Sequence, residues 1–152
     1  MTRTTARQLA LQLEFSAAAS GEAAGAVFDD FFSREHYATL ASEHKLFADF
    51  PDQKQLDYIR SLTALLDEHR AEFDAFIEKY AKGWKLERIS RTARAILRCA
   101  MCEILYVEDV PAAAAINEAV ELSKSYDEPE AAPFINGILG SFVKGELGET
   151  AE

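Results

Sequence analysis

The spacing of apolar residues constrains this chain most strongly, because they recur every three or four positions over long stretches. The clearest stretch lies between Ser90 and Tyr106, where the side chains expected to point inward are Ala93, Ile96, Leu97, Ala100, Met101, Ile104 and Leu105. This spacing puts apolar side chains on one face of an α-helix, whereas a half-buried strand would alternate at every second residue. The sequence therefore predicts an all-helical protein.

The same spacing, with the residues that begin and end helices, predicts the helical segments. Helices are expected over residues 3–19, 22–32, 52–82, 90–106, 109–126 and 134–147, with an interruption near 68–71 and an irregular connection at 33–51 that has room for one short helix. Asp52 and Ser90 are expected N-caps, and Asp109 is expected to cap a helix that has Pro111 in its first turn. Residues 1–152 are therefore expected to form one domain of about seven helices.

Charge is unevenly distributed along the chain, whose net charge is −10 from 16 basic and 26 acidic residues. An acidic protein is a poor partner for nucleic acid unless its basic residues are gathered in one place. Residues 79–98 contain seven basic side chains and one acid, Glu87, while residues 1–13 contain Arg3 and Arg7 and no acid. A polarised surface is therefore compatible with the composition.

The basic run has two interpretations. Arg91, Arg94 and Arg98 recur at helical spacing and are expected to form one stripe opposite the apolar face. The stripe is either a solvated surface with some members paired to acids, or an electrostatic surface for RNA or an acidic partner. Because Arg98 follows Leu97 at the edge of the buried face, it is expected to be a structural ion-pair residue.

Cys99 and Cys102 form a CxxC pattern, which occurs in thiol redox pairs and in halves of metal sites. Here the pattern is expected in the middle of a helix, whereas a redox pair sits at a helix start that lowers the thiol pKa. Core packing is therefore expected, and the redox or metal interpretation ranks last. His36, His44 and His69 show no ligand spacing. The sequence predicts no metal site, no cofactor and no enzymatic activity.

Two asparagines stand beside apolar residues, in the segments INEAVELSK and FINGIL. A buried amide must be hydrogen-bonded, and neighbouring helix ends carry free backbone groups. Asn117, with the adjacent Glu118, and Asn136 are therefore expected to be structural and to tie the last two helices to the core. Gly137 is expected to permit a close approach of helices.

No apolar run reaches the ~18 residues that a membrane span requires, so no membrane association is expected. The N-terminal segment MTRTTARQLALQLEF lacks the continuous apolar stretch and the small-residue cleavage site of a secretory signal. Together with the two cysteines, these observations predict a protein of the reducing cytoplasm.

A series of short motifs runs in order through the second half of the chain. Between Trp84 and Leu139 the sequence contains WKLERI, AILRCAMCE, DVP, INEAVELSK and FINGIL, and the N-terminal segment ARQLALQ adds a further match. In order and spacing these motifs resemble the NusB family of bacterial transcription antitermination factors. Residues 20–55 match that family weakly.

The resemblance implies an all-helical fold of two small bundles packed crosswise. It also implies a non-enzymatic factor that binds boxA-type RNA together with the ribosomal protein NusE. Within the antitermination complex, such a factor helps RNA polymerase to read through terminators in ribosomal RNA operons. Homodimers occur in this fold, so the resemblance leaves both a monomer and a homodimer open.

The resemblance further assigns an RNA-binding role to individual residues. Arg3 and Arg7 correspond to the basic residues of the first helix that contact RNA in the family. Glu130 and Phe134 correspond to an acidic residue and a phenylalanine that lie near bound RNA.

On the protein-binding side, Phe15 aligns with an aromatic residue that contacts NusE. Ala93 stands where the family can have an acidic NusE-contacting side chain. Thr4 and Thr5 occupy positions that are commonly basic, and Pro133 replaces a residue that can be lysine. These departures leave a second hypothesis open, in which the chain is a protein-only scaffold that binds NusE with lost or weak RNA recognition. A third, the RNA-binding appendage of a ribosomal RNA methyltransferase, is disfavoured because no catalytic domain is present.

Overall fold

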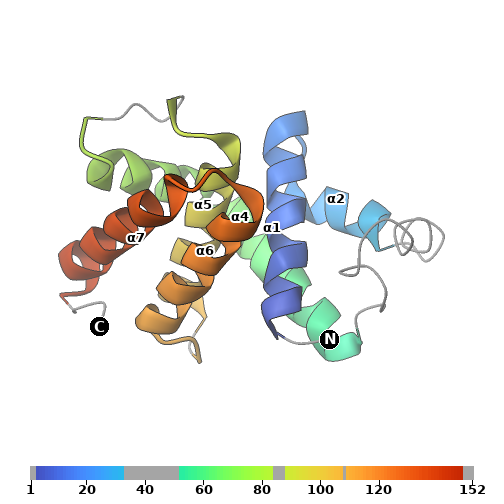
Figure 1. Cartoon of the computed structure of the whole chain (residues 1–152). Coiled ribbons are helices and arrows are strands. Elements are labelled where there is room, and N and C mark those ends of the chain that lie inside the picture. Colours follow the sequence, from blue (N-terminus) through green and yellow to red (C-terminus); the bar gives the residue numbers. More distant parts are fainter. Residues whose placement is uncertain (1–2, 33–51, 84–87, 108, 149–152) are drawn as a thin grey trace. The chain divides into compact units, whose positions relative to one another are not determined.

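The computed structural model describes residues 3–32, 52–83, 88–107 and 109–148. These residues form six α-helices, one short π-helix and no strand, which confirms the predicted all-helical fold. The helices are α1 (Arg3–Ser20), α2 (Ala24–Phe31), α4 (Gln53–Tyr80), α5 (Arg91–Tyr106), α6 (Ala112–Tyr126) and α7 (Ala131–Phe142), and the π-helix is η3 (Val143–Leu147) (Figure 1). They belong to two compact units, unit 1 (Met1–Glu68) and unit 2 (His69–Glu152). The connection expected at 33–51 lies outside the described residues.

In unit 1, α1 and α2 pack on each other. The chain turns between them at Gly21, whose φ of 78° lies in the left-handed region that glycine adopts at little cost. The buried face of α1 consists of Ala6, Leu9, Ala10, Leu11, Leu13, Glu14 and Ala17. The apolar members recur at the helical spacing seen in the sequence, so the predicted first helix is confirmed.

The start of α2 is held by a side chain from α4. The two carboxylate oxygens of Asp67 accept hydrogen bonds from the backbone N–H groups of Ala24, at 2.8 Å, and Gly25, at 3.0 Å. These donors belong to the first turn of α2, where no helical carbonyl is available to them. The guanidinium of Arg60 also lies over the Phe28 ring, 4.6 Å from its centroid. A charge and an aromatic ring thus fix α2 against α4 within unit 1.

The long helix α4 begins as predicted, because the Asp52 carboxylate accepts a hydrogen bond from the Gln55 N–H at 2.9 Å. It then runs continuously to Tyr80, so the predicted interruption near 68–71 is wrong. Those residues, Glu-His-Arg-Ala, include neither glycine nor proline, and nothing in them opposes helical backbone.

Unit 2 is centred on α5, which contacts both α6 and α7, while α6 and α7 also contact each other. Ser90 caps α5 as predicted, since its Oγ accepts a hydrogen bond from the Ala93 N–H at 3.0 Å. The largest fully buried side chains of this unit are Phe73, Ile77, Ile96, Leu97, Met101, Ile135 and Phe142. These side chains come from α4, α5 and α7, and α6 adds the buried Ala115, Ile116, Ala119 and Leu122.

The starts of α6 and α7 differ from the prediction. The N-cap residue of α6 is Pro111, which makes no side-chain cap hydrogen bond, so the prediction that Asp109 is the N-cap residue is wrong. The last α-helix begins at Ala131 rather than Phe134, with Pro133 in its first turn. Proline is tolerated there because its missing N–H would have no partner inside the helix.

The C-terminal end of α7 also departs from the prediction, because its last turn becomes the π-helix η3. Glu146 of η3 lies 2.6 Å from the Lys79 Nζ and accepts a hydrogen bond from the Tyr80 hydroxyl. A Cβ added at Gly145 would collide with the Tyr80 ring, so glycine permits this close approach. The π-helix η3 is thereby attached to the last turn of α4 within unit 2.

Candidate nucleic-acid interface

A hollow of about 360 Å³ lies in unit 2 where the start of α5 faces the turn between α6 and α7. We call it the α5–α7 hollow. Its lining residues are Arg88, Ile89, Ser90, Ala93, Asp127, Glu128, Glu130, Ala131 and Phe134. Three residues selected from the sequence, Ala93, Glu130 and Phe134, therefore border the same space.

A hydrogen bond joins two side chains of the lining, those of Ser90 and Asp127. The Ser90 Oγ donates to the Asp127 Oδ2 at 2.8 Å while it accepts from the Ala93 N–H. The other carboxylate oxygen, Oδ1, accepts from the Glu128 N–H at 2.8 Å. One serine thus caps α5 and links its start to the residue that follows α6.

The chemistry of the α5–α7 hollow suits a nucleobase better than a phosphate. Its charged lining consists of one cation, Arg88, and the carboxylates of Asp127, Glu128 and Glu130. Carboxylates repel phosphate, but they accept hydrogen bonds from the amino groups of bases. Phe134 is half-buried in the first turn of α7 and contributes an aromatic side chain to the lining of the hollow, the kind of group on which bases stack.

The first helix presents a different chemistry in unit 1. Arg3 is exposed and Arg7, one turn later, is half-buried. Arg3 borders a second hollow of about 270 Å³, the α1–α4 hollow, which is lined by Arg3, Ala6, Lys54, Gln55 and Tyr58. The Arg3 guanidinium lies over the Tyr58 ring, 4.7 Å from the centroid. Arg7 does not line this hollow.

The two residues assigned to protein binding are placed differently. Phe15 is 39% exposed on α1, a high value for a phenylalanine, and two turns beyond Arg7. An exposed aromatic ring of this kind is suited to a protein contact. Ala93 is buried and lines the α5–α7 hollow.

The predicted arginine stripe is divided in the structure. Arg98 is buried, and its Nε lies 2.7 Å from the Asp74 Oδ1 of α4. The sequence assigned an ion-pair role to Arg98, and the structure places a carboxylate beside it. Arg91 is exposed and Arg94 is half-buried, so only these two remain near the surface. The expectation of one stripe of three arginines opposite the apolar face is therefore wrong.

The asparagines and Gly137 do not have the positions expected of them. Asn117 and Asn136 are both exposed, so the prediction that they tie the last helices to the core is wrong. Gly137 is exposed too, and a Cβ added there would meet no atom within 4 Å, so it permits no close helix approach. Glu118 is half-buried on α6.

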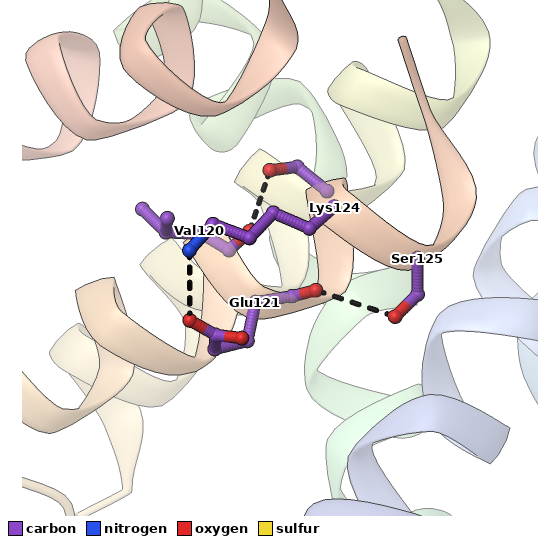
Figure 2. A network of polar contacts seen from close by, with 5 residues as sticks. Val120, Glu121, Lys124 and Ser125 are labelled. Atoms are coloured by element: carbon purple, nitrogen blue, oxygen red, sulfur yellow. Dashed lines mark hydrogen bonds and ion pairs between the residues drawn. The ribbon is translucent and has the colours of Figure 1, made fainter. Parts of the chain in front are cut away.

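The polar side chains in the second half of α6 bond within the helix itself (Figure 2). The Ser123 Oγ donates to the Val120 carbonyl at 2.6 Å, which satisfies a side chain with no exposed surface. Lys124 lies 3.1 Å from the Glu121 Oε1, and the Ser125 Oγ donates to the Glu121 carbonyl. This part of INEAVELSK therefore serves α6 locally.

Cys99 and Cys102 are both buried free cysteines in α5, which confirms the core-packing interpretation. No group of three or more His, Cys, Asp or Glu residues in the described part of the chain could hold a metal ion. His36 and His44 lie outside the described residues, while His69 stacks on Tyr106 with ring centroids 4.2 Å apart. No helix of the described ranges is long and apolar enough to cross a membrane.

Sequence reasoning missed Lys54 and Tyr58, which line the α1–α4 hollow, and the bond between Ser90 and Asp127. Lys54 and Tyr58 belong to a helix whose polar positions look solvated in the sequence. Ser90 and Asp127 are 37 positions apart, so no local pattern relates them. Only the packing of helices brings these groups to the two hollows.

Comparison with known proteins gives a consistent result. The model of the NusB family matches residues 4–144. The transcription antitermination protein NusB of Symbiobacterium thermophilum is 37% identical over 148 residues, which cover 97% of this chain and 93% of that protein. The protein of the same name from Clostridium perfringens is 35% identical over 144 residues, covering 95% and 98%.

Solved structures agree with this result at the level of the fold. NusB of T. maritima has a TM-score of 0.79 at 24% identity, covering 100% of this chain and 94% of that one. A chain in a crystal structure of a plectonemic RNA supercoil also has a TM-score of 0.79 at 24% identity, covering 97% and 98%.

Proposed function

Because the chain belongs to the NusB family of transcription antitermination proteins, we propose that it binds boxA-type RNA jointly with the ribosomal protein NusE. In this role it acts in the cytoplasm, as part of the antitermination complex of RNA polymerase, and promotes read-through in ribosomal RNA operons. It works by binding and not by catalysis.

The observation that carries the proposal is the extent of the family match. The match from residue 4 to residue 144 covers α1 from its second residue onward, α7 and everything between them. If only the structural core were shared with the family, the match would say nothing about the residues on the surface. Here the motifs that surround Phe134 and the sequence of the first helix belong to the matched region as well.

The two hollows give this proposal a physical form. Arg3 and Arg7 supply positive charge for the RNA backbone, which carries most of the affinity and no sequence information. Phe134 supplies a stacking face and the carboxylate of Glu130 stands beside it, so the α5–α7 hollow is suited to an unpaired base. Phe15 offers NusE an exposed aromatic anchor.

A titration of labelled boxA-type RNA with the chain alone, with NusE alone and with both proteins tests the proposal. Two arginines on α1 provide few phosphate contacts, so the chain alone should bind weakly. The pair should bind roughly tenfold more tightly or better, because the RNA then contacts two linked surfaces. RNA binding by the pair that is no tighter than by NusE alone would contradict the proposal.

The scaffold hypothesis remains the second candidate, and one observation favours it. Thr4 and Thr5 leave α1 with only two basic residues in its first two turns, while carboxylates border the α5–α7 hollow. In this case the chain would bind NusE and leave the affinity of NusE for RNA unchanged. The same titration, with a direct measurement of NusE binding, separates the two hypotheses.

A further inference from the structure

We propose that the α1–α4 hollow is a phosphate subsite for single-stranded RNA, in which Lys54 and Arg3 bind the backbone and Tyr58 positions Arg3. The inference rests on the proposed RNA-binding function and extends it from the first helix to the start of α4. Neither the sequence motifs nor the family comparison assigns a role to Lys54 or Tyr58.

The geometry of the hollow brings two cations from different helices to one concave space. Arg3 comes from the first turn of α1, and Lys54 comes from the first turn of α4. Both side chains are exposed, so both can reach a ligand in solvent. Ala6 contributes only a methyl group to the wall and leaves room between the two charges.

Tyr58 fixes one of these cations. With the Arg3 guanidinium 4.7 Å from the Tyr58 ring centroid, the planar group is held over an aromatic face. Such a contact favours the cation by about 0.5–1 kcal/mol at an exposed site. A guanidinium held in this way is prearranged for the paired oxygens of a phosphate.

Two acids near the start of α4, Asp52 and Asp57, make hydrogen bonds to groups of α4 itself. Asp52 uses its Oδ1 to cap the helix at the Gln55 N–H. Asp57 accepts a hydrogen bond from the Gln53 Nε2 at 2.8 Å. Neither carboxylate lines the hollow, whose charged lining is Arg3 and Lys54. Among the described residues, the charged lining of this hollow is therefore positive, although the whole chain is acidic.

These features favour the RNA backbone over a base or a protein. A base would need an open aromatic face, but the Tyr58 ring already has the guanidinium over it. A protein anchor would need an apolar wall, which here is limited to Ala6 and parts of longer side chains. Two cations from different helices match the non-bridging oxygens of one phosphate or of two consecutive phosphates on a flexible strand.

Salt titrations of boxA-type RNA binding to the complex with NusE test the subsite. Lys54→Gln should weaken binding on the order of threefold and reduce the steepness of log K against log salt by about 0.7. Lys144→Gln, which removes an exposed lysine of η3, is the matched control and should change neither value. Circular dichroism of the variants checks that the helices remain intact.

The role of Tyr58 needs a separate measurement. Tyr58→Leu should weaken RNA binding, but only when Arg3 is present, so its effect should vanish in an Arg3→Gln background. Tyr58→Phe keeps the ring and should bind like the original protein. If Tyr58→Leu and Arg3→Gln weaken RNA binding additively in the double variant, Tyr58 does not position Arg3.

Three results would overturn the inference in distinguishable ways. An unchanged salt slope in Lys54→Gln, with normal RNA binding by the original complex, contradicts the subsite and leaves the proposed function intact. A loss of NusE binding in Lys54→Gln, measured without RNA, would make the hollow a protein contact. No RNA binding by the original complex would remove the proposed function, and the subsite with it.

Discussion

The two hollows of this chain are alike in origin and opposite in chemistry. Each is formed where the start of one helix meets another element of the same unit, and each is a few hundred cubic ångströms in volume. The α1–α4 hollow presents two cations, Arg3 and Lys54, whereas the α5–α7 hollow presents carboxylates beside the Phe134 ring. One is suited to a phosphate and the other to a base.

The comparison shows why a net charge of −10 decides little about RNA binding. Backbone contacts require positive potential only where the phosphates lie. A base pocket tolerates carboxylates, and it uses them to accept hydrogen bonds from amino groups. A chain can therefore be acidic as a whole and divide RNA recognition between a small basic site and a small acidic one.

The largest expected effect comes from a change in the α5–α7 hollow, the one suited to a base. Phe134→Ala removes the stacking face and should weaken RNA binding by the NusE complex by about 1–3 kcal/mol, while the salt slope stays nearly constant. Fluorescence titrations at several salt concentrations measure both quantities. NusE binding without RNA should survive Phe134→Ala and should suffer from Phe15→Ala, which serves as the reciprocal control.

The next largest effect comes from removing the α1 arginines that are expected to contact phosphates. Replacing Arg3 and Arg7 together by alanine should weaken RNA binding and reduce the steepness of the salt slope by about 0.7 for each lost contact. The control replaces Lys124 and Lys144, two exposed lysines, and changes the net charge equally. Equal slopes in the two double variants would show that only net charge matters, and the contrast between the hollows would then be lost.

A third change loosens the α5–α7 hollow without touching its aromatic wall. Ser90→Ala removes the α5 cap and the hydrogen bond to Asp127, and should cost about 1 kcal/mol of unfolding free energy. Urea unfolding measures the loss, with Ser61→Ala at an exposed position inside α4 as the control. If the bond sets the width of the hollow, Ser90→Ala should also weaken RNA binding, although less than Phe134→Ala.

Much of the fold was predictable because its signals are local. The helical spacing gave α1 and α5 with nearly correct bounds, and the caps at Asp52 and Ser90 form the expected hydrogen bonds. A cap satisfies donors within three residues of itself, so it can be read from a few neighbouring letters. The family motifs then identified Glu130 and Phe134, which the fold places at one hollow.

The errors at the two asparagines concern which way a residue faces on its helix. The buried residues of α6 are Ala115, Ile116, Ala119, Leu122 and Ser123, and those of α7 are Ile135, Ile138, Leu139 and Phe142. Each set forms one arc, and Asn117 and Asn136 fall outside it although each follows a buried isoleucine. Adjacency in sequence was taken for adjacency in space. The α1–α4 hollow was missed because it depends on helices that meet only in the fold.

The smallest expected effect concerns a polar contact outside both hollows, between η3 and the end of α4. The Glu146 carboxylate accepts hydrogen bonds from Lys79 and Tyr80, and these bonds lower the pKa of Glu146 below the ordinary value of 4.5. The hydrogen bond to Glu146 raises the pKa of Lys79 above 10.5. The Glu146 contribution is therefore present above pH 4.5 and is lost as the pH falls through its lowered pKa. The Lys79 contribution is present below pH 10.5 and is lost as the pH rises through its raised pKa.

Hydrogen exchange of the Val143–Leu147 amides, corrected for intrinsic rates, should accordingly be constant between these limits and accelerate below pH 4.5. The change should be modest because Lys79 is 60% exposed. Glu146→Gln should remove the acid dependence and leave RNA binding unaltered, since Glu146 lines neither hollow. If exchange still accelerates at acid pH in Glu146→Gln, other carboxylates cause the acceleration. A loss of RNA affinity in the same variant would show that RNA contacts reach beyond the two hollows.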